Sequence, residues 1–197
     1  MPFLQYTCIL YVAEKYSPSG GQPMIYFMEN NIIIRRMQET DPQIFSNEEC
    51  AQGWHASPEK YDMRISDEKK GISVALTAEY QNHPAGYINV YWNCAAGPFA
   101  DKNIPEIVDF GVLEKYRNKG IGGLLMDTAE KIVLTRSKIV CIGVGLHAGY
   151  GSAQRMYVKR GYIPDGSGVW YRDQICTPYG DCCNDDDLVL YLSKELD

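Results

Sequence analysis

The sequence predicts an α+β (mixed α/β) domain built in layers on a mixed sheet. Two observations predict it. The length of 197 residues suits one domain, and 45% hydrophobic with 22% charged residues is a globular composition. Strand-like and helix-like segments follow in the order strand, two helices, hairpin, strand, long helix, strand, short helix and two strands.

The first strand is expected at residues 31–37, where NIIIRRM is a short β-branched apolar run. A helix should open at Ser46, because Ser46 and Glu49 have the spacing of a capping box. A second short helix should open at residues 57–59, where serine is the cap, proline is the first helical residue and glutamate lies in the first turn.

Two β-rich runs, residues 72–80 and 85–92, flank the turn-forming residues 81–84 and predict an antiparallel hairpin. Residues 93–103 are expected to form a loop. The next strand is expected over residues 104–113, with its proline near the start.

The longest helix is predicted over residues 120–135, where the apolar positions follow the spacing of one helix face. Residues 138–146 are almost continuously apolar, which is typical of a strand with both sheet faces covered. A short helix should then run over residues 152–160, and two last strands over residues 169–172 and 188–192.

The formal net charge of −6 argues against nucleic acid as a principal partner, because phosphate binding needs a clustered basic surface. The composition suggests no membrane span. Seven cysteines without a CxxC pair predict a reduced, cytoplasmic protein that holds no metal.

The linker-like composition of residues 17–23 suggests that residues 1–27 are an N-terminal extension outside a domain at residues 28–197. Residues 1–16 lack the basic region of a signal peptide.

The segment from Val112 to Gly123 carries the chemistry, because a strand runs into a glycine-rich turn and then into the long helix. A helix start presents unpaired N–H groups and the positive end of its dipole, and glycines at 120 and 122 let a phosphate approach the backbone. A pyrophosphate would fit this turn. A nucleotidase is a weaker alternative, because the turn lacks the Lys-Ser/Thr pair of a Walker loop.

The turn resembles the Arg/Gln-x-x-Gly-x-Gly/Ala motif of the GNAT superfamily of N-acetyltransferases, carried here by Arg117, Asn118, Lys119, Gly120, Ile121 and Gly122. A second GNAT pattern is matched by Ala153, Tyr157, Gly161 and Tyr162. One departure is Tyr150, which stands where the family often has asparagine, so a contact to CoA is lost or replaced there.

The resemblance covers residues 32–196 and implies a mostly antiparallel central sheet flanked by helices on both faces. It also implies that acetyl-CoA is the co-substrate and lies between the strands at 104–113 and 138–147. Backbone groups of Phe110, Gly111 and Val112 would pair with its pantetheine arm, and the amides of residues 117–122 would hold its pyrophosphate.

The resemblance further implies catalytic roles for Glu106 and Tyr157. Glu106 stands eleven residues before Arg117, where some GNAT enzymes place a glutamate general base, and Tyr157 matches the general acid. A glutamate needs partial burial to raise its pKa for this work at neutral pH. Asp109 should point to the opposite face from Glu106 in a regular strand, and a β-bulge would change that.

The chain is therefore expected to acetylate an amine of a small molecule or peptide by direct transfer, with Glu106 acting directly or through water. The alternative is a non-catalytic acyl-CoA-binding or regulatory module. His147, at the end of the strand over residues 138–146, could help to bind the acceptor. The identity of the amine stays open, and an edge strand near the C-terminus would allow a homodimer.

Overall fold

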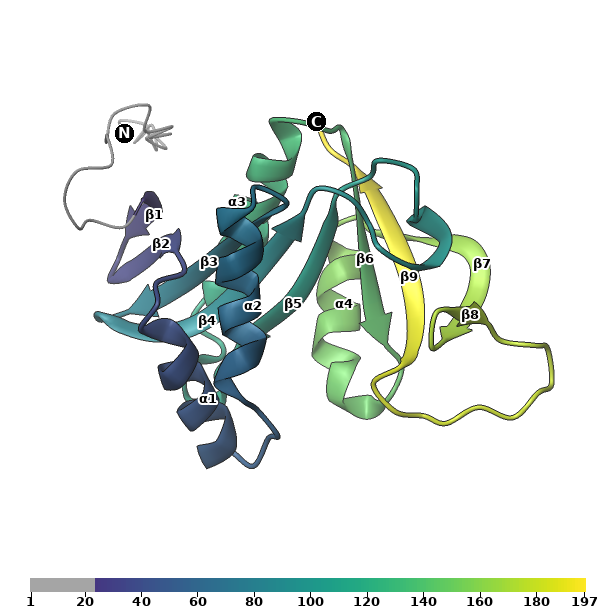
Figure 1. The fold of residues 1–197 in the computed structure, drawn as a ribbon, viewed down its shortest axis with the longest axis horizontal. Coiled ribbons are helices and arrows are strands. Elements are labelled where there is room, and N and C mark those ends of the chain that lie inside the picture. The colour runs from purple at the N-terminus through teal and green to yellow at the C-terminus, as the bar shows by residue number, and fades with distance from the viewer. Residues whose placement is uncertain (1–23) are drawn as a thin grey trace, which may run out of the picture.

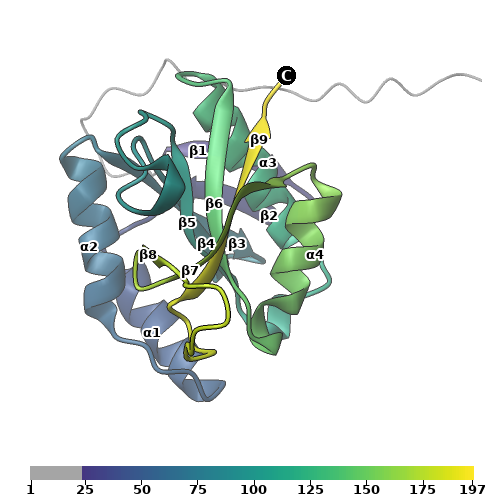
Figure 2. The same cartoon turned by 90° about the vertical axis from the view of Figure 1, so that its right-hand side faces the viewer.

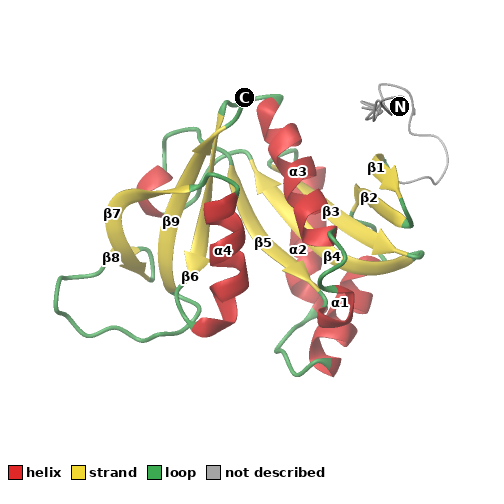
Figure 3. Ribbon diagram, turned by 180° about the vertical axis from the view of Figure 1, so that it is seen from behind, coloured by secondary structure: helices red, strands yellow, loops and turns green. Residues whose placement is uncertain are grey.

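The computed structural model describes residues 24–197, which form one nine-stranded sheet with four α-helices (Figure 1). Helices α1 (Asp41–Ala51) and α2 (Pro58–Lys69) cover one face of the sheet, and α3 (Ile121–Leu134) and α4 (Gly151–Lys159) cover the other. Figure 2, seen toward the edge of the sheet, and Figure 3, seen from behind, show these layers. The predicted fold class is confirmed.

The strand order is β1-β2-β3-β4-β5-β6-β9-β7-β8, and every neighbouring pair is antiparallel except β5 and β6. The strands are β1 (Ile25–Glu29), β2 (Ile32–Arg36), β3 (Ser73–Tyr80), β4 (His83–Tyr91), β5 (Glu106–Val112), β6 (Ile139–Gly145), β7 (Ile163–Tyr171), β8 (Gln174–Ile175) and β9 (Leu188–Glu195). In residues 24–197, no helix is long and apolar enough to cross a membrane.

The helix expected to open at Ser46 opens at Asp41 instead, so the capping-box interpretation was wrong. Ser46 is buried in the middle of α1, and its hydroxyl donates to the carbonyl of Ala56 at 3.4 Å. Pro42 in the first turn fits the true start, because proline needs no N–H partner there. The predicted start of α2 at Ser57 is confirmed.

Strand β1 was not predicted, and the expected domain boundary at residue 28 falls inside it. Residues 25–27 pair with β2, so they join the sheet, whereas residues 1–23 of the expected extension lie outside the described residues. The hairpin turn is also tighter than expected. Only Gln81 and Asn82 form it, both with positive φ, as a two-residue hairpin turn requires.

The faces of the sheet carry separate hydrophobic cores. The larger core lies under α3, whose buried side of Ile121, Leu125, Ala129 and Val133 follows the predicted spacing. The smaller core, under α1 and α2, is centred on the rings of Phe45, Tyr61 and Tyr87, whose centroids lie 5.1–5.4 Å apart. These cores hold the helices that flank the candidate site.

A buried ion pair ties α1 to the sheet. Two nitrogens of Arg35 on β2 donate to the carboxylate of Asp41 at 2.7 and 2.9 Å, and the hydroxyl of Thr77 donates to it at 2.8 Å. Both charged side chains are almost fully buried, so each depends on the other for compensation.

Candidate functional site

Strands β5 and β6 are joined only at one end. Their parallel pairing consists of Glu106 with Cys141 and Ile107 with Ile142, and no later pair follows among the described residues. Figure 1 shows the two strands diverging from that end. The edge of β5 after Ile107 is therefore free of the neighbouring strand, and those of its backbone groups that are not bonded within the chain are available to a ligand.

A β-bulge interrupts β5 directly after this point. Val108 pairs with Asn89 and Gly111 pairs with Tyr87, so two residues of β5, Asp109 and Phe110, oppose the single residue between those two on β4. Asp109 has a φ of 56°, in the left-handed region. The buried amide of Asn89 donates to the carbonyls of Val108 and Asp109 at 3.4 and 3.3 Å and holds the bulge from β4.

The bulge decides which side chains share a face. Glu106 pairs with Tyr91, whose hydroxyl contacts α2, so Glu106 also stands on the α2 face. Asp109 would face α3 in a regular strand, yet its carboxylate contacts α2. Phe110 packs in the core on the α3 face. Asp109 would oppose Glu106 in a regular strand, and the bulge brings it to the same face instead, as expected for a bulged strand.

Glu106 lies in a half-buried position at the start of β5, beside two buried thiols. Cys141 is its strand partner, and Cys94 lies in the loop after β4. Burial raises the pKa of Glu106 to about 8, the Cys94 thiol adds to the rise, and Arg64 opposes it. A carboxylate with such a pKa holds and releases a proton near neutral pH.

Sequence reasoning missed two cations of α2 that contact the carboxylate of Asp109. Lys60 Nζ lies 2.8 Å from Asp109 Oδ1, and Arg64 Nε lies 3.4 Å from Asp109 Oδ2. Arg64 also donates to the hydroxyl of Tyr91 at 2.7 Å. The four-residue spacing of Lys60 and Arg64 on an expected helix was a signal that they share one face.

Tyr157 lies on the opposite face, in α4. Its ring is 5% exposed and lies 6.5 Å from the ring of Phe110 and 5.8 Å from that of Tyr162. Burial raises the pKa of the Tyr157 hydroxyl above its usual value, and the nearby Tyr150 adds to the rise. Among residues 24–197, no hydrogen-bond partner contributes to the pKa of this hydroxyl.

The glycine-rich turn between β5 and α3 has the expected helix-start geometry. Gly120 is the residue before α3 and has a φ of 82°, and Asn118 has a φ of 60°. The first backbone bond of the helix runs from Leu124 N to Gly120 O at 3.1 Å, so the amides of residues 121–123 precede it and lack helical acceptors. Unpaired amides at a helix start are the kind of donor group that can receive an anion.

The basic side chains of the turn contact aromatic rings. The guanidinium of Arg117 lies 5.5 Å from the ring centre of Trp54 and donates to the carbonyl of Val112 at 3.3 Å. The Lys119 ammonium lies 5.1 Å from the ring centre of Tyr80. The backbone amides are thus better placed than these side chains to hold an anion at the turn.

Gly122 lets α3 approach β5 closely. A Cβ at this position would lie 3.2 Å from Phe110 Cζ and 3.3 Å from Met156 Cε. By contrast, a Cβ at Gly120 or Gly123 would meet nothing within 4 Å. The turn is therefore closed on the side of the core and open on the outside, which leaves room for a ligand at the backbone.

A surface pocket of about 550 Å³ lies beside this turn, between the β1–β2 hairpin and the start of α3. Sequence reasoning did not anticipate it, because one wall comes from the unpredicted β1. Its lining residues are Phe27, Glu29, Asn30, Ile32, Tyr80, Lys119, Gly120, Gly123, Leu124 and Asp127.

His147 is part of a small polar cluster at the end of β6. Its Nδ1 accepts from the amide of Gly149 at 3.0 Å, so its Nε2 donates to Asp186 Oδ1 at 2.9 Å in the neutral ring. The hydroxyl of Tyr150 donates to the same oxygen at 2.9 Å. These bonds hold the pKa of Asp186 below its usual value and tie its loop to β6.

A sequence model of the acetyltransferase (GNAT) family matches residues 35–162, well over half of the chain. That range includes Glu106, Tyr157 and the whole glycine-rich turn. No curated protein sequence matches the chain significantly.

Solved acetyltransferase structures share the fold. The enzyme from Salmonella typhimurium that modifies the N-terminal serine of ribosomal protein L7/L12 has 13% identity and a TM-score of 0.61, over 86% of this chain and 97% of that one. A ribosomal-protein-alanine N-acetyltransferase from Brucella melitensis has 16% identity and a TM-score of 0.60, over 83% and 99%. The proposed acetyltransferase yncA from Salmonella typhimurium was solved with its cofactor acetyl-CoA. It has 13% identity and a TM-score of 0.60, over 85% of this chain and 95% of that one.

Proposed function

Since the chain belongs to the GNAT acetyltransferase family, we propose that it is an N-acetyltransferase that moves an acetyl group from acetyl-CoA to an amine by direct transfer. The observation that carries the proposal is the split between β5 and β6. Glu106, whose carboxyl group has a pKa of about 8, lies at the joined end of this split, and Tyr157 packs against Phe110 on the part of β5 beyond the junction. The acceptor is an amine of a small molecule or of a peptide.

The residues around the split fit acetyl-CoA. The open side of Gly120 and the free amides of residues 121–123 suit its pyrophosphate, and the free edge of β5 at Phe110, Gly111 and Val112 suits the amide groups of its pantetheine arm. Acetyl-CoA supplies an acetyl group activated as a thioester. The proton transfers of the reaction are proposed for residues of the chain.

Glu106 is proposed as the general base. An amine attacks only after it has lost its proton, and the amine must lose a further proton as the new amide bond forms. A carboxylate whose pKa is raised to about 8 accepts such a proton far better than an ordinary exposed glutamate. It receives the proton directly or through water.

Tyr157 is proposed as the general acid. Its hydroxyl, which has no hydrogen-bond partner among the causes of its pKa shift within the described residues, would donate a hydrogen bond or a proton to the sulfur that leaves with CoA. The raised pKa keeps this hydroxyl protonated at neutral pH, which is the state that a donor needs. Because Cys141 is fully buried, direct transfer is favoured over an acyl-cysteine.

The test is a titration of the purified protein with acetyl-CoA in a calorimeter, followed by a thiol-release assay with a panel of amines. The panel includes peptides that begin with serine or alanine, prompted by the substrates of the Salmonella and Brucella enzymes, and small mono- and polyamines. Binding with turnover supports the enzyme. Binding without turnover for every amine favours a non-catalytic acyl-CoA module, and no binding rejects the site.

A further inference from the structure

The carboxylate of Asp109 bridges β5 and α2 at the centre of the candidate site. Its Oδ1 lies 2.8 Å from Lys60 Nζ and its Oδ2 lies 3.4 Å from Arg64 Nε. The side chains of Asp109 and Arg64 are each 16% exposed, so water screens this pair less than a surface pair. The two ion pairs join the bulge to one side of the helix.

The backbone of Asp109 needs such support. Its φ of 56° is uncommon for a residue with a side chain, although aspartate and asparagine tolerate it better than most. On the β4 side, Asn89 holds the carbonyls of Val108 and Asp109. On the α2 side, the carboxylate of Asp109 ties the bulge to Lys60 and Arg64. The bulge is thus held between a buried amide and two cations.

The bulge connects the two halves of the site. Glu106 lies three residues before Asp109, and the free backbone edge proposed for pantetheine begins at the next residue, Phe110. A strand that lost the extra residue would turn Phe110 and Val112 toward α2. The position of Glu106 relative to that edge therefore depends on the conformation of Asp109.

Arg64 also acts on Glu106 from α2. The groups that face Glu106 are Arg64, Cys94 in the loop after β4, Cys141 on β6, Asp173 after β7 and Tyr191 on β9. Arg64 is the cation among them, and it lowers the pKa of Glu106 while the two thiols and Asp173 do not. Asp109 thus holds Arg64, the cation that lowers the pKa of Glu106, in place.

We propose that Asp109 is a positioning residue, whose ion pairs with Lys60 and Arg64 fix the bulge of β5 and so set Glu106 against the backbone edge that receives acetyl-CoA. This inference rests on the proposed function. It assigns to α2 a role in the donor site, although α2 lies on the opposite face of the sheet from α3 and its glycine-rich turn.

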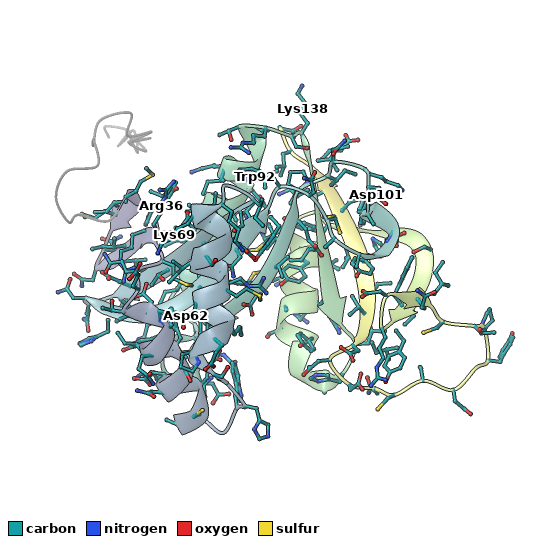
Figure 4. All side chains as sticks on the ribbon, in the orientation of Figure 1. Arg36, Asp62, Lys69, Trp92, Asp101 and Lys138 are labelled. Carbon is teal, nitrogen blue, oxygen red and sulfur yellow. The ribbon has the colours of Figure 1, made fainter. Side chains whose placement is uncertain are left out.

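The first experiment measures acetyl-CoA binding by calorimetry for Asp109→Asn, which keeps a residue that tolerates the left-handed backbone and removes the charge. We expect the Kd to rise by roughly tenfold or more, because small misplacements at a binding site have large effects. Lys69→Met is the matched control, since it also removes an ion pair of α2, with Glu39 at 2.6 Å. Figure 4 labels Lys69 on α2, away from β6. Its Kd should equal that of the wild type.

The second experiment follows the carboxyl carbon of Glu106 by NMR as a function of pH, with Glu106→Gln to assign the signal. In Arg64→Gln we expect the pKa of Glu106 to rise above its wild-type value of about 8, and the Kd for acetyl-CoA to rise as in Asp109→Asn. Loss of the Arg64 charge alone raises that pKa, so the Kd for acetyl-CoA is the quantity that a purely structural ion pair would leave unchanged in a folded protein. If Asp109→Asn does not fold, Arg64→Gln tests the same ion pair by removing its partner on α2.

Wild-type Kd values in both folded variants would overturn the inference, as would an equal loss of affinity in Lys69→Met. None of these measurements needs the acceptor amine. If the thiol-release screen finds no turnover but the variants behave as expected, the proposed activity fails and the positioning role of Asp109 in acyl-CoA binding stands. If turnover is found and the variants match the wild type, only the role of Asp109 fails.

Discussion

Glu106 and Tyr91 lie opposite each other on β5 and β4, and Tyr91 is bonded to α2 on the face where Glu106 stands. Tyr157 lies on the other face, packed against Phe110. The proposed base and the proposed acid therefore lie on opposite faces of the sheet, Glu106 at the joined end of β5 and Tyr157 beside the part of β5 beyond that junction.

Replacing the proposed base should remove the pH dependence of the reaction. In the wild type, kcat/KM should rise with pH up to about 8, because Glu106 accepts a proton only when it is ionised. Glu106→Gln should lower kcat/KM by roughly 10² or more and abolish that rise. Glu39→Gln, which changes an exposed carboxylate, should leave the profile as it is. An unchanged limb in Glu106→Gln would exclude this residue as the base.

The same carboxyl group should make stability fall as pH rises. Its pKa is about 8 in the folded protein and 4.5 as the ordinary value, so between these values the folded state binds more protons than the unfolded state. The stabilising contribution is fully present below pH 4.5 and is lost as pH rises through about 8. Urea unfolding at pH 6 and 9 should show a larger fall in the free energy of unfolding for the wild type than for Glu106→Gln.

Removing the hydroxyl of Tyr157 should slow turnover without loosening the donor. We expect Tyr157→Phe to lower kcat by about 10²-fold and to leave the Kd of acetyl-CoA within about twofold. Tyr162→Phe is the matched control, because Tyr162 is also buried but donates to Glu130 at 3.2 Å. It should lose about 1 kcal/mol of stability and keep kcat. Equal values of kcat in the two variants would argue against the acid role.

The two glycines of the first turn of α3 should respond differently to alanine. A Cβ at Gly122 would press on Phe110 and Met156, so Gly122→Ala should shift the turn and weaken acetyl-CoA binding by roughly tenfold. A Cβ at Gly123 meets open space, and alanine there should raise the free energy of unfolding by up to about 1 kcal/mol. Calorimetry and urea unfolding of both variants check this, and equal affinities would contradict it.

Breaking the buried ion pair under α1 should destabilise the whole domain. Asp41→Ala leaves the guanidinium of Arg35 buried with only part of its compensation, so we expect a loss of about 3–5 kcal/mol. The exposed pair of Lys115 and Glu48 is the comparison, and Glu48→Ala should cost at most about 1 kcal/mol. Thermal unfolding of both variants would show whether burial makes this difference.

Sequence reasoning succeeded where periodicity alone decides structure. Helix α3 followed from its apolar spacing, and β6 followed from an apolar run at the centre of a sheet covered on both faces. The start of α1 was misjudged because a capping box is a local pattern, whereas Ser46 is buried by tertiary contacts. Strand β1 was missed because its pattern is weak without the partner strand β2.

In the candidate site, too, the local conformation was predictable and the tertiary contacts were not. The glycine-rich turn was predicted because its residue types are needed for the local backbone conformation, as glycine is for the positive φ at residue 120. The bulge at Asp109 depends on Asn89 and on two cations of α2, none of them close in sequence. A pattern of residues along one strand contains no information about such partners, so the face that Asp109 takes could not be derived.

The short junction of β5 and β6 has a mechanical consequence. With only two pairs of residues joining them, the sheet consists of a five-stranded and a four-stranded part that meet at a narrow waist. A donor lying along the free edge would act as a temporary extra strand across that waist. Its binding would then stabilise both parts of the sheet against local opening. Acetyl-CoA should therefore slow amide hydrogen exchange in the five-stranded and the four-stranded parts, and not only around the glycine-rich turn.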